Sequence, residues 1–276
     1  MLTALSIENL TSEKWYKKVL NKLRGDAVRV DIRSARGVAL RHITYLSRSG
    51  TVNWARLSKL IGAQRNHLLC GDDILLPADM GFRRFDNKAF KIQLASNLGV
   101  FVLSKLKNKV SDISVGIYDL RGDCTRLLAE IVRYTDNLTV VTDNLDAYNA
   151  AAAAVSEDIG AVVQVTDNRA RLMDCALLIA PEQINELLPL SGNVIVLTGA
   201  APTVCTPGLI YYDYHFRMPN MFDRIKPADL SVEYFAGALY TKARQYELGS
   251  IVPTACSNYA SSQTYRSICE HLMNSN

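Results

Sequence analysis

The chain has 276 residues, 49% of them hydrophobic and 21% charged, with a formal net charge of +4; this composition is that of a globular protein with one large or two modest domains. No apolar run approaches the roughly 20 residues needed to cross a bilayer, so the sequence predicts no membrane-spanning helix. The first residues, MLTALSIENLTSEKWYKK, lack the basic segment and the long apolar segment of a secretory signal, and a cytoplasmic location is therefore expected.

The charge is divided unevenly along the chain. Residues 1–110 contain 20 Lys and Arg against 8 Asp and Glu, a net charge of +12, whereas residues 111–276 contain 11 against 19, a net charge of −8. A change of this size beside the polar segment 104–112 predicts a domain boundary there. We therefore expect a smaller, basic domain of residues 1–110 and a second domain of residues 111–276.

The first of these domains is predicted to be mixed α+β. Apolar residues recur at three- and four-residue spacing in its helical segments, and turn residues separate its strands. The elements expected in chain order are a short helix at 15–23, strands at 27–33 and 38–46, a helix with Thr51 as its N-cap, strands at 67–70 and 73–77, and a long helix within 87–109.

The second domain alternates strands with helices. Strands are expected at 113–120, 138–142, 161–166, 175–181, 193–199 and 208–214. Helices are expected at 124–135 and 145–160, and a last one at 231–248 is expected to pack over an edge of the sheet. Strands that are apolar throughout and alternate with amphipathic helices indicate a doubly wound α/β fold with a parallel sheet, in strand order 3-2-1-4-5-6.

The tetrapeptide VTDN occurs twice, ending at Asn144 and at Asn168, each time directly after a predicted strand. Asp and Asn are typical of turns, and the simplest interpretation of Asp143 and Asp167 is that their side chains satisfy backbone groups of a turn. Asp143 also has a functional interpretation. It lies 24 residues after Asp119, at the end of the second strand, where nucleotide-binding sheets hold the ribose hydroxyl groups.

The segments VGIYDLRGDCTRLLAEIVRYTDNLTVVTDN (115–144) and DCALLIAP (174–181) together resemble the dinucleotide domain of shikimate dehydrogenase, glutamyl-tRNA reductase and related amino-acid dehydrogenases. The resemblance extends over residues 113 to 214 and concerns the order of elements more than any motif. It implies a Rossmann-type fold, a nicotinamide cofactor and an aspartate, here Asp174, before the fourth strand.

The first turn departs from the G-x-G-x-x-G pattern of dinucleotide sites. Asp119, Arg121 and Cys124 stand where the pattern has glycines, and the one glycine present, Gly122, is displaced. Arg121 would fill the space of a pyrophosphate and Asp119 would repel it, so ordinary NAD or NADP binding is disfavoured. Arg121 could instead hold a phosphate group directly. The candidate ligand-binding residues are Asp119, Arg121, Gly122 and Asp143.

His215, within YYDYHFR, is the candidate general acid or base, because imidazole titrates near neutral pH. The alternative is a structural histidine among aromatic side chains. The predicted carboxyl edge of the sheet offers no nucleophile–base pair and no Lys–Asp dyad of the shikimate dehydrogenase kind. The sequence therefore leaves a catalytic role and a binding role open.

Cysteine and histidine usage predicts neither disulfides nor a metal site. The six cysteines are scattered without a C-x-x-C pair, which in a chain without a secretory signal favours free thiols. The four histidines are isolated, and no Cys/His pair has the spacing of zinc ligands.

Three classes of function remain. The first is a Rossmann-like protein that binds a small anionic or nucleoside-containing ligand at the carboxyl edge of the sheet, without ordinary NAD binding. The second is an NAD(P)-dependent oxidoreductase of the shikimate dehydrogenase-like group. The third is nucleic-acid or polyanion binding by the basic half, which is disfavoured because the basic residues are spread through every predicted element.

Overall fold

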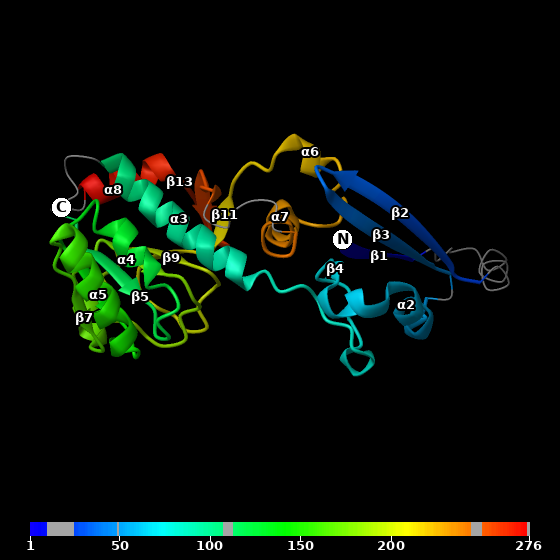
Figure 1. Ribbon diagram of the computed structural model, residues 1–276, viewed down its shortest axis with the longest axis horizontal. Helices are drawn as coiled ribbons and strands as arrows, with labels where there is room; N and C mark the ends of the chain where they lie inside the picture. The colour runs from blue at the N-terminus through cyan, green and yellow to red at the C-terminus, as the bar shows by residue number, and fades with distance from the viewer. Residues whose placement is uncertain (10–24, 49, 107–112, 244–249, 275–276) are drawn as a thin grey trace. The chain divides into compact units, whose positions relative to one another are not determined.

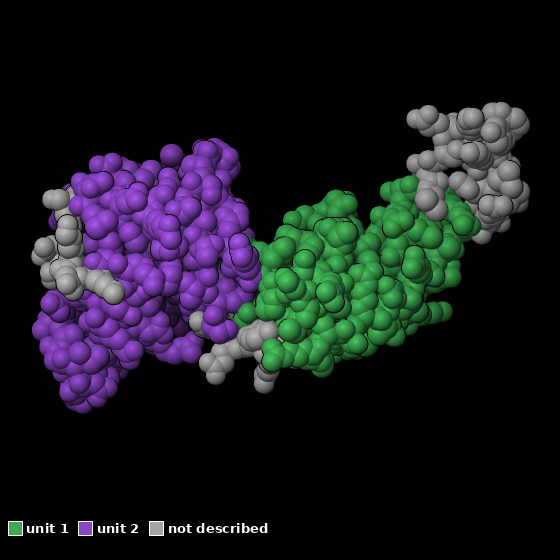
Figure 2. All heavy atoms as spheres, turned by 90° about the horizontal axis from the view of Figure 1, so that it is seen from above, with its two compact units in different colours: residues 1–87, 218–247 green, residues 88–217, 248–276 purple. Residues whose placement is uncertain are grey.

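The computed structural model describes residues 1–9, 25–48, 50–106, 113–243 and 250–274. Contacts divide the chain into two compact units, coloured separately in Figure 2: residues 1–87 with 218–247, and residues 88–217 with 248–276. These units differ from the predicted domains of residues 1–110 and 111–276, because they place the long helix that begins at Lys88 in the second unit and residues 218–247 in the first. The helix predicted at 15–23 and most of the segment 104–112 lie outside the described residues.

The first unit contains a four-stranded sheet. Its strands are β1 (Leu2–Asn9), β2 (Ala27–Ala35), β3 (Val38–Ser47) and β4 (Leu69–Cys70), in the order β2-β3-β1-β4. β1 is parallel to β3 and to β4, and β2 is antiparallel to β3. Arg36 and Gly37 have φ angles of 48° and 83°, which suit the two central residues of a tight hairpin between β2 and β3.

Helices complete this unit. Those among the described residues are α2 (Trp54–Ile61), η1 (Gly62–His67), η2 (Ala78–Met80), α6 (Asn220–Asp223) and α7 (Val232–Thr241). α2 buries Leu57 and Ile61 in a core that also contains Ile43 and Tyr45 of β3. The N-cap of α2 is Asn53, whose Oδ1 accepts a hydrogen bond from the Arg56 N–H at 3.0 Å, so the prediction of Thr51 as the cap is wrong.

Two further predictions for these segments are wrong. Residues 73–77 form no strand, because Asp72 and Asp73 begin a turn and the following residues run without a partner strand in the described part of the chain. A helix does form within the predicted range 231–248, as α7, but it belongs to the first unit, whereas it was predicted to pack over an edge of the parallel sheet. Residues 244–248 lie outside the described residues. The hydroxyl of Tyr234 on α7 donates to the carbonyl oxygen of Phe85 at 3.0 Å, and Phe235 and Leu239 are fully buried.

The second unit contains a six-stranded sheet that is parallel throughout. Its strands are β5 (Val115–Tyr118), β6 (Leu138–Val141), β7 (Gln164–Thr166), β8 (Leu177–Ala180), β9 (Ile195–Thr198) and β10 (Leu209–Tyr211). They follow the order β10-β9-β8-β5-β6-β7. Numbered along the chain, this is the predicted order 3-2-1-4-5-6, and the doubly wound, Rossmann-like fold is confirmed.

Helices and irregular segments cover the two faces of this sheet. The helical elements are α3 (Lys88–Leu106), α4 (Arg126–Ile131), α5 (Leu145–Ile159), η4 (Arg169–Leu172) and α8 (Tyr265–Asn274) (Figure 1). α3 packs closely on β8 and β9, because a Cβ added at Gly99 would overlap the side chain of Ile179 and touch Leu197. On the other face, Leu172, Ile184 and Leu188 bury Leu178 and Val196 of the sheet.

A small antiparallel sheet of β11 (Asp213–His215), β12 (Ala255–Ser257) and β13 (Ser262–Thr264) also belongs to the second unit. The predicted sixth strand, 208–214, is therefore two strands of different sheets. Tyr214 of β11 links the two sheets, because its hydroxyl donates to the carbonyl oxygen of Thr198 at the end of β9, at 2.8 Å.

Candidate functional site

The two VTDN segments make the same local structure at the carboxyl ends of β6 and β7. The hydroxyl oxygen of Thr142 accepts a hydrogen bond from the Asn144 N–H at 3.0 Å, and that of Thr166 accepts one from Asn168 at 3.1 Å. Asn144 then caps α5. Asn168 caps η4 in the same way. The threonines and asparagines thus serve the turns, which leaves the side chain of Asp143 available for another partner.

Asp119 directly follows β5 and is fully buried. Its carboxylate accepts hydrogen bonds from the N–H groups of Gly122 at 3.1 Å and Cys124 at 2.8 Å, and from the hydroxyl of Tyr148 at 2.9 Å. In a dinucleotide site the N–H groups of this first turn face the pyrophosphate. Here a carboxylate of the protein itself already binds two of them.

Gly122 is the one glycine of this turn, and its conformation explains its presence. Its φ angle of 77° lies in the left-handed region, and a Cβ at this position would lie 3.0 Å from Asn144 Nδ2 and 3.2 Å from Ala147 Cβ. Asn144 Nδ2 donates to the carbonyl oxygen of Arg121 at 2.9 Å. The glycine therefore lets the first turn pack against the start of α5.

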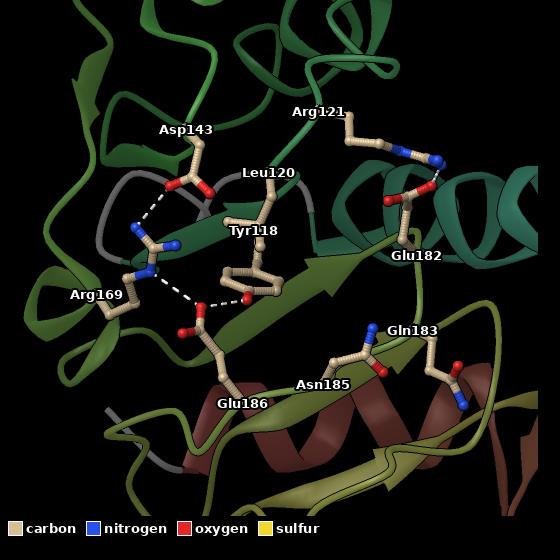
Figure 3. Close-up of a pocket in the computed structure, with 9 residues that line it drawn as sticks. All are labelled: Tyr118, Leu120, Arg121, Asp143, Arg169, Glu182, Gln183, Asn185 and Glu186. Carbon is tan, nitrogen blue, oxygen red and sulfur yellow. Dashed lines mark hydrogen bonds and ion pairs between the residues drawn. The ribbon is translucent and has the colours of Figure 1, made fainter.

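A pocket of about 370 Å³ opens at the carboxyl edge of the parallel sheet (Figure 3). Its lining residues end or follow four different strands, β5 to β8, and the pocket includes the point between β5 and β8 where the strand order reverses. This is the usual position of a ligand site in a doubly wound fold. The lining residues are Tyr118, Leu120, Arg121, Asp143, Arg169, Glu182, Gln183, Asn185 and Glu186.

Arg169 connects two carboxylates on one side of this pocket. Its Nη1 lies 2.8 Å from Asp143 Oδ1, and its Nε lies 2.9 Å from Glu186 Oε1. The hydroxyl of Tyr118 donates to the same Glu186 oxygen at 2.5 Å. The hydrogen bonds from Tyr118 and Arg169 lower the pKa of Glu186, while burial and then the bond to Glu186 raise the pKa of Tyr118. The pKa of Arg169 is raised by its bonds to Asp143 and Glu186, so its charge is secure.

Glu182 occupies the opposite side of the pocket. Its carboxylate pairs with the guanidinium group of Arg121, and the amino group of Lys88 lies 3.6 Å away. Arg121 also contacts Asp123, through its Nε at 3.2 Å. The pocket thus has three carboxylates against two guanidinium groups among its lining residues.

The predicted site residues fall into two places. Asp119, Arg121, Gly122 and Asp143 come together at the carboxyl edge, where Arg121 and Asp143 line the pocket and Asp119 lies buried beneath the turn. His215 does not join them. It is exposed on β11, where its Nε2 lies 2.9 Å from Ser257 Oγ, and its proposed acid–base role stays a prediction.

Several lining residues were not singled out from the sequence, notably Tyr118, Arg169 and Glu186. A signal for Arg169 exists, because it directly follows the second VTDN, and for Tyr118, because it is the last residue of β5. Glu186 offers no such signal, since it lies in an irregular connection between β8 and β9 whose path depends on tertiary packing.

No protein-family model and no curated protein matches the chain. Among solved structures, it is similar to L-tryptophan dehydrogenase from Nostoc punctiforme, with 11% identity and a TM-score of 0.34, over 99% of this chain and 80% of that one. It is also similar to a shikimate dehydrogenase in complex with NADP+, with 9% identity and a TM-score of 0.32, over 99% of this chain and 95% of that one. The Rossmann-like fold stands on the strand order and register.

Two further findings concern the described part of the chain. No group of three or more His, Cys, Asp and Glu side chains in it is arranged to hold a metal ion. None of its helices combines the length and the apolar character needed to span a membrane.

Proposed function

We propose that the second unit binds a small polar ligand with hydroxyl groups, of the nucleoside type, in the pocket at the carboxyl edge, and that it binds this ligand without a pyrophosphate. The observation that carries the proposal is the placement of Asp119. Its buried carboxylate accepts hydrogen bonds from the N–H groups of Gly122 and Cys124. A pyrophosphate at this turn would require the same N–H groups.

A phosphorylated ligand would meet further obstacles beside that turn. The carboxylate of Asp119 would repel a phosphate group, and no solvent reaches it to screen the repulsion. The two arginines of the pocket are already paired, Arg121 with Glu182 and Arg169 with Asp143 and Glu186. A phosphate group that recruited either arginine would leave a carboxylate behind with its charge uncompensated.

Hydroxyl groups suit the pocket better than anionic groups do. Carboxylates accept hydrogen bonds from neutral donors such as hydroxyl and amino groups. Asp143 is the one most open to a ligand, because its side chain is 56% exposed while it also lines the pocket. It directly follows β6, where an acidic residue binds ribose hydroxyls in nucleotide-binding sheets. A nucleoside combines such a diol with an uncharged base that Tyr118 and Leu120 can contact.

The other two classes of function have less support. The dehydrogenases reported above are similar in fold only, and the oxidoreductase alternative requires a cofactor whose pyrophosphate has no free N–H groups at Gly122 and Cys124. Polyanion binding by the basic half is less supported because two of its lysines already lie near carboxylates. Lys88 lies near Glu182, and Lys91 lies near Asp213.

Replacing Asp143 with asparagine tests the ligand. We expect the parent to be stabilised against heat by nucleosides, and Asp143→Asn to bind them about tenfold to a hundredfold more weakly, because an amide is the poorer acceptor for a diol. The unfolding free energy without ligand should change by less than about 1 kcal/mol, since the Asp143–Arg169 pair is partly exposed. The measurement is thermal unfolding across a panel of nucleosides, nucleotides, sugars and amino acids.

Asp167→Asn is the matched control, because Asp167 has the same place in the second VTDN and does not line the pocket. It should keep the full response to nucleosides. Equal nucleoside affinity in the parent and in Asp143→Asn would refute the diol site, and a tighter response to nucleotides than to nucleosides would show that the site prefers phosphate.

The cofactors themselves give a separate prediction. NAD(H) and NADP(H) should bind more weakly than about 1 mM, because the carboxylate of Asp119 occupies the N–H groups of the first turn. Isothermal titration calorimetry measures this directly. Micromolar affinity for either cofactor would contradict the proposal and support the oxidoreductase alternative.

A further inference from the structure

β2 is an edge strand of the first unit's sheet. It pairs with β3 along its whole length of nine residues, and in the described part of the chain no strand pairs with its other edge (Figure 1). The unpaired N–H and C=O groups of such an edge are a template for another strand. Proteins usually protect a long edge by shortening it, bending it or charging it.

β2 lacks most of these protections on one of its faces. Val28, Val30 and Ile32 alternate along the strand and so lie on the same face of the sheet. Val30 is 42% exposed and Ile32 is 68% exposed. Val28 packs against the core of the unit, whereas Val30 and Ile32 would gain apolar neighbours if another strand paired with this edge.

The opposite face of β2 carries charges of both signs. Arg29, Asp31 and Arg33 alternate there, and Arg33 Nε lies 2.8 Å from Asp31 Oδ2. Arg33 and Arg29 together lower the pKa of Asp31, with the hydrogen bond from Arg33 as the largest cause. The strand therefore presents positive, negative and positive charges in turn, and an antiparallel copy matches them only in a register that places an arginine opposite the aspartate.

We propose that two copies of this protein pair through β2, antiparallel, about a two-fold axis at Val30. This register places Val30 opposite the partner's Val30 and Val28 opposite the partner's Ile32. Each apolar side chain then has an apolar neighbour across the new strand pair. On the other face it places Arg29 opposite the partner's Asp31, twice by symmetry. Such an isologous contact joins two four-stranded sheets into one of eight strands.

Other registers match less well. An axis at Asp31 would place Arg29 opposite the partner's Arg33, and like charges directly opposite each other destabilise a strand pair. An axis at Ile32 would pair Asp31 with the partner's Arg33, but it would place Val30 opposite the partner's Ser34. Charge and apolar matching occur together at the Val30 axis.

Disulfide trapping tests both the contact and its register. Directly opposed residues of an antiparallel pair have Cα atoms about 4.5 to 5.5 Å apart, which lies within the roughly 4.4 to 6.8 Å between the Cα atoms of a disulfide. We therefore expect Val30→Cys to form a covalent dimer under mild oxidation. Ser34→Cys lies on the same strand and face, but the Val30 axis places it far from its own mate, so it should form no more dimer than the parent. Equal trapping of the two variants would overturn the register.

Charge exchange tests the pairing without a covalent bond. By sedimentation equilibrium, Arg29→Glu and Asp31→Arg should each raise the dimer dissociation constant about tenfold, because each places like charges opposite each other twice. The double variant R29E/D31R should recover affinity, since the charges match again.

Val30→Lys should abolish the dimer, whereas Leu75→Lys, at an exposed apolar residue outside β2, should leave it unchanged.

Circular dichroism of each variant separates misfolding from lost pairing. A parent that stays monomeric at all concentrations would overturn the proposal. So would a dimer that is indifferent to Val30→Lys.

Discussion

Replacing Asp119 with alanine is expected to lower the free energy of unfolding by about 3 kcal/mol or more. The substitution removes the acceptor of three hydrogen bonds, from two backbone N–H groups of the first turn and from the hydroxyl of Tyr148. Tyr148 is fully buried, so no water can replace the carboxylate at its hydroxyl group. Chemical denaturation measures the loss.

A double variant separates these contributions. Tyr148→Phe removes the stranded hydroxyl, so D119A/Y148F should be more stable than Asp119→Ala alone by about 1 kcal/mol. Asp123→Ala is the control in the same turn, because Asp123 is exposed and pairs only with Arg121 among the residues described. It should change stability by less than about 0.5 kcal/mol.

Inorganic phosphate provides a second readout for the same variant. In Asp119→Ala the N–H groups of Gly122 and Cys124 lose their acceptor, and the repelling charge beside them is gone. Phosphate should then stabilise Asp119→Ala against heat more than it stabilises the parent. Asp119→Ala with the parent's stability would show that the carboxylate does not hold the turn.

Replacing Gly199 with alanine should cost about 2 to 3 kcal/mol of stability. An added Cβ would overlap the carbonyl oxygen of Pro181 and would lie 3.2 Å from Ile92 Cγ1. Gly199 directly follows β9 and its N–H donates to that same carbonyl oxygen at 3.1 Å, so the new methyl group pushes apart the ends of two neighbouring strands. Backbone cannot move aside as a flexible side chain can.

The same substitution should weaken ligand binding in the pocket. The hydroxyl of Thr198 donates to the carbonyl oxygen of Glu182 at 2.6 Å, so a shift of Pro181 moves a lining residue. Gly192→Ala is the control, because a Cβ there meets nothing within 4 Å. It should leave thermal stability and nucleoside binding close to the parent. A Gly199→Ala protein as stable as Gly192→Ala would mean that the strand ends tolerate separation.

The parallel sheet could be predicted because each of its central strands is apolar throughout. β5, β6, β8 and β9 are buried along their whole length, and such strands leave a strong signal in a single sequence. β1 was missed although it lies between β3 and β4, because its pattern of Leu2, Thr3, Ala4, Leu5 and Ser6 has no clear alternation. The placement of α7 depends on contacts with residues some 150 positions away, such as Tyr234 with Phe85.

The candidate site, too, could be predicted in part from the sequence. The residues that end β5 and β6 were predicted to meet at the carboxyl edge, because parallel strands bring their carboxyl ends to one side of a sheet. It was predicted that Asp and Asn side chains satisfy backbone groups of these turns, but not which of them do so. Thr142 accepts a hydrogen bond within the turn, Asn144 caps α5, and the charged partner of Asp143 is Arg169 rather than a backbone group. Side-chain choices of this kind depend on which charges meet in space.

The division of the chain into units affects how the protein can be made and dissected. The first unit is completed by residues 218–247 and the second by residues 248–276, so the chain passes from one unit to the other three times. During synthesis, the ribosome produces the entire parallel sheet before α7, and the core that receives Phe235 and Leu239 cannot close until then. A single cut at any position leaves at least one unit without part of its core. Expressing the units separately therefore requires joining distant segments, such as residues 1–87 directly to residues 218–247.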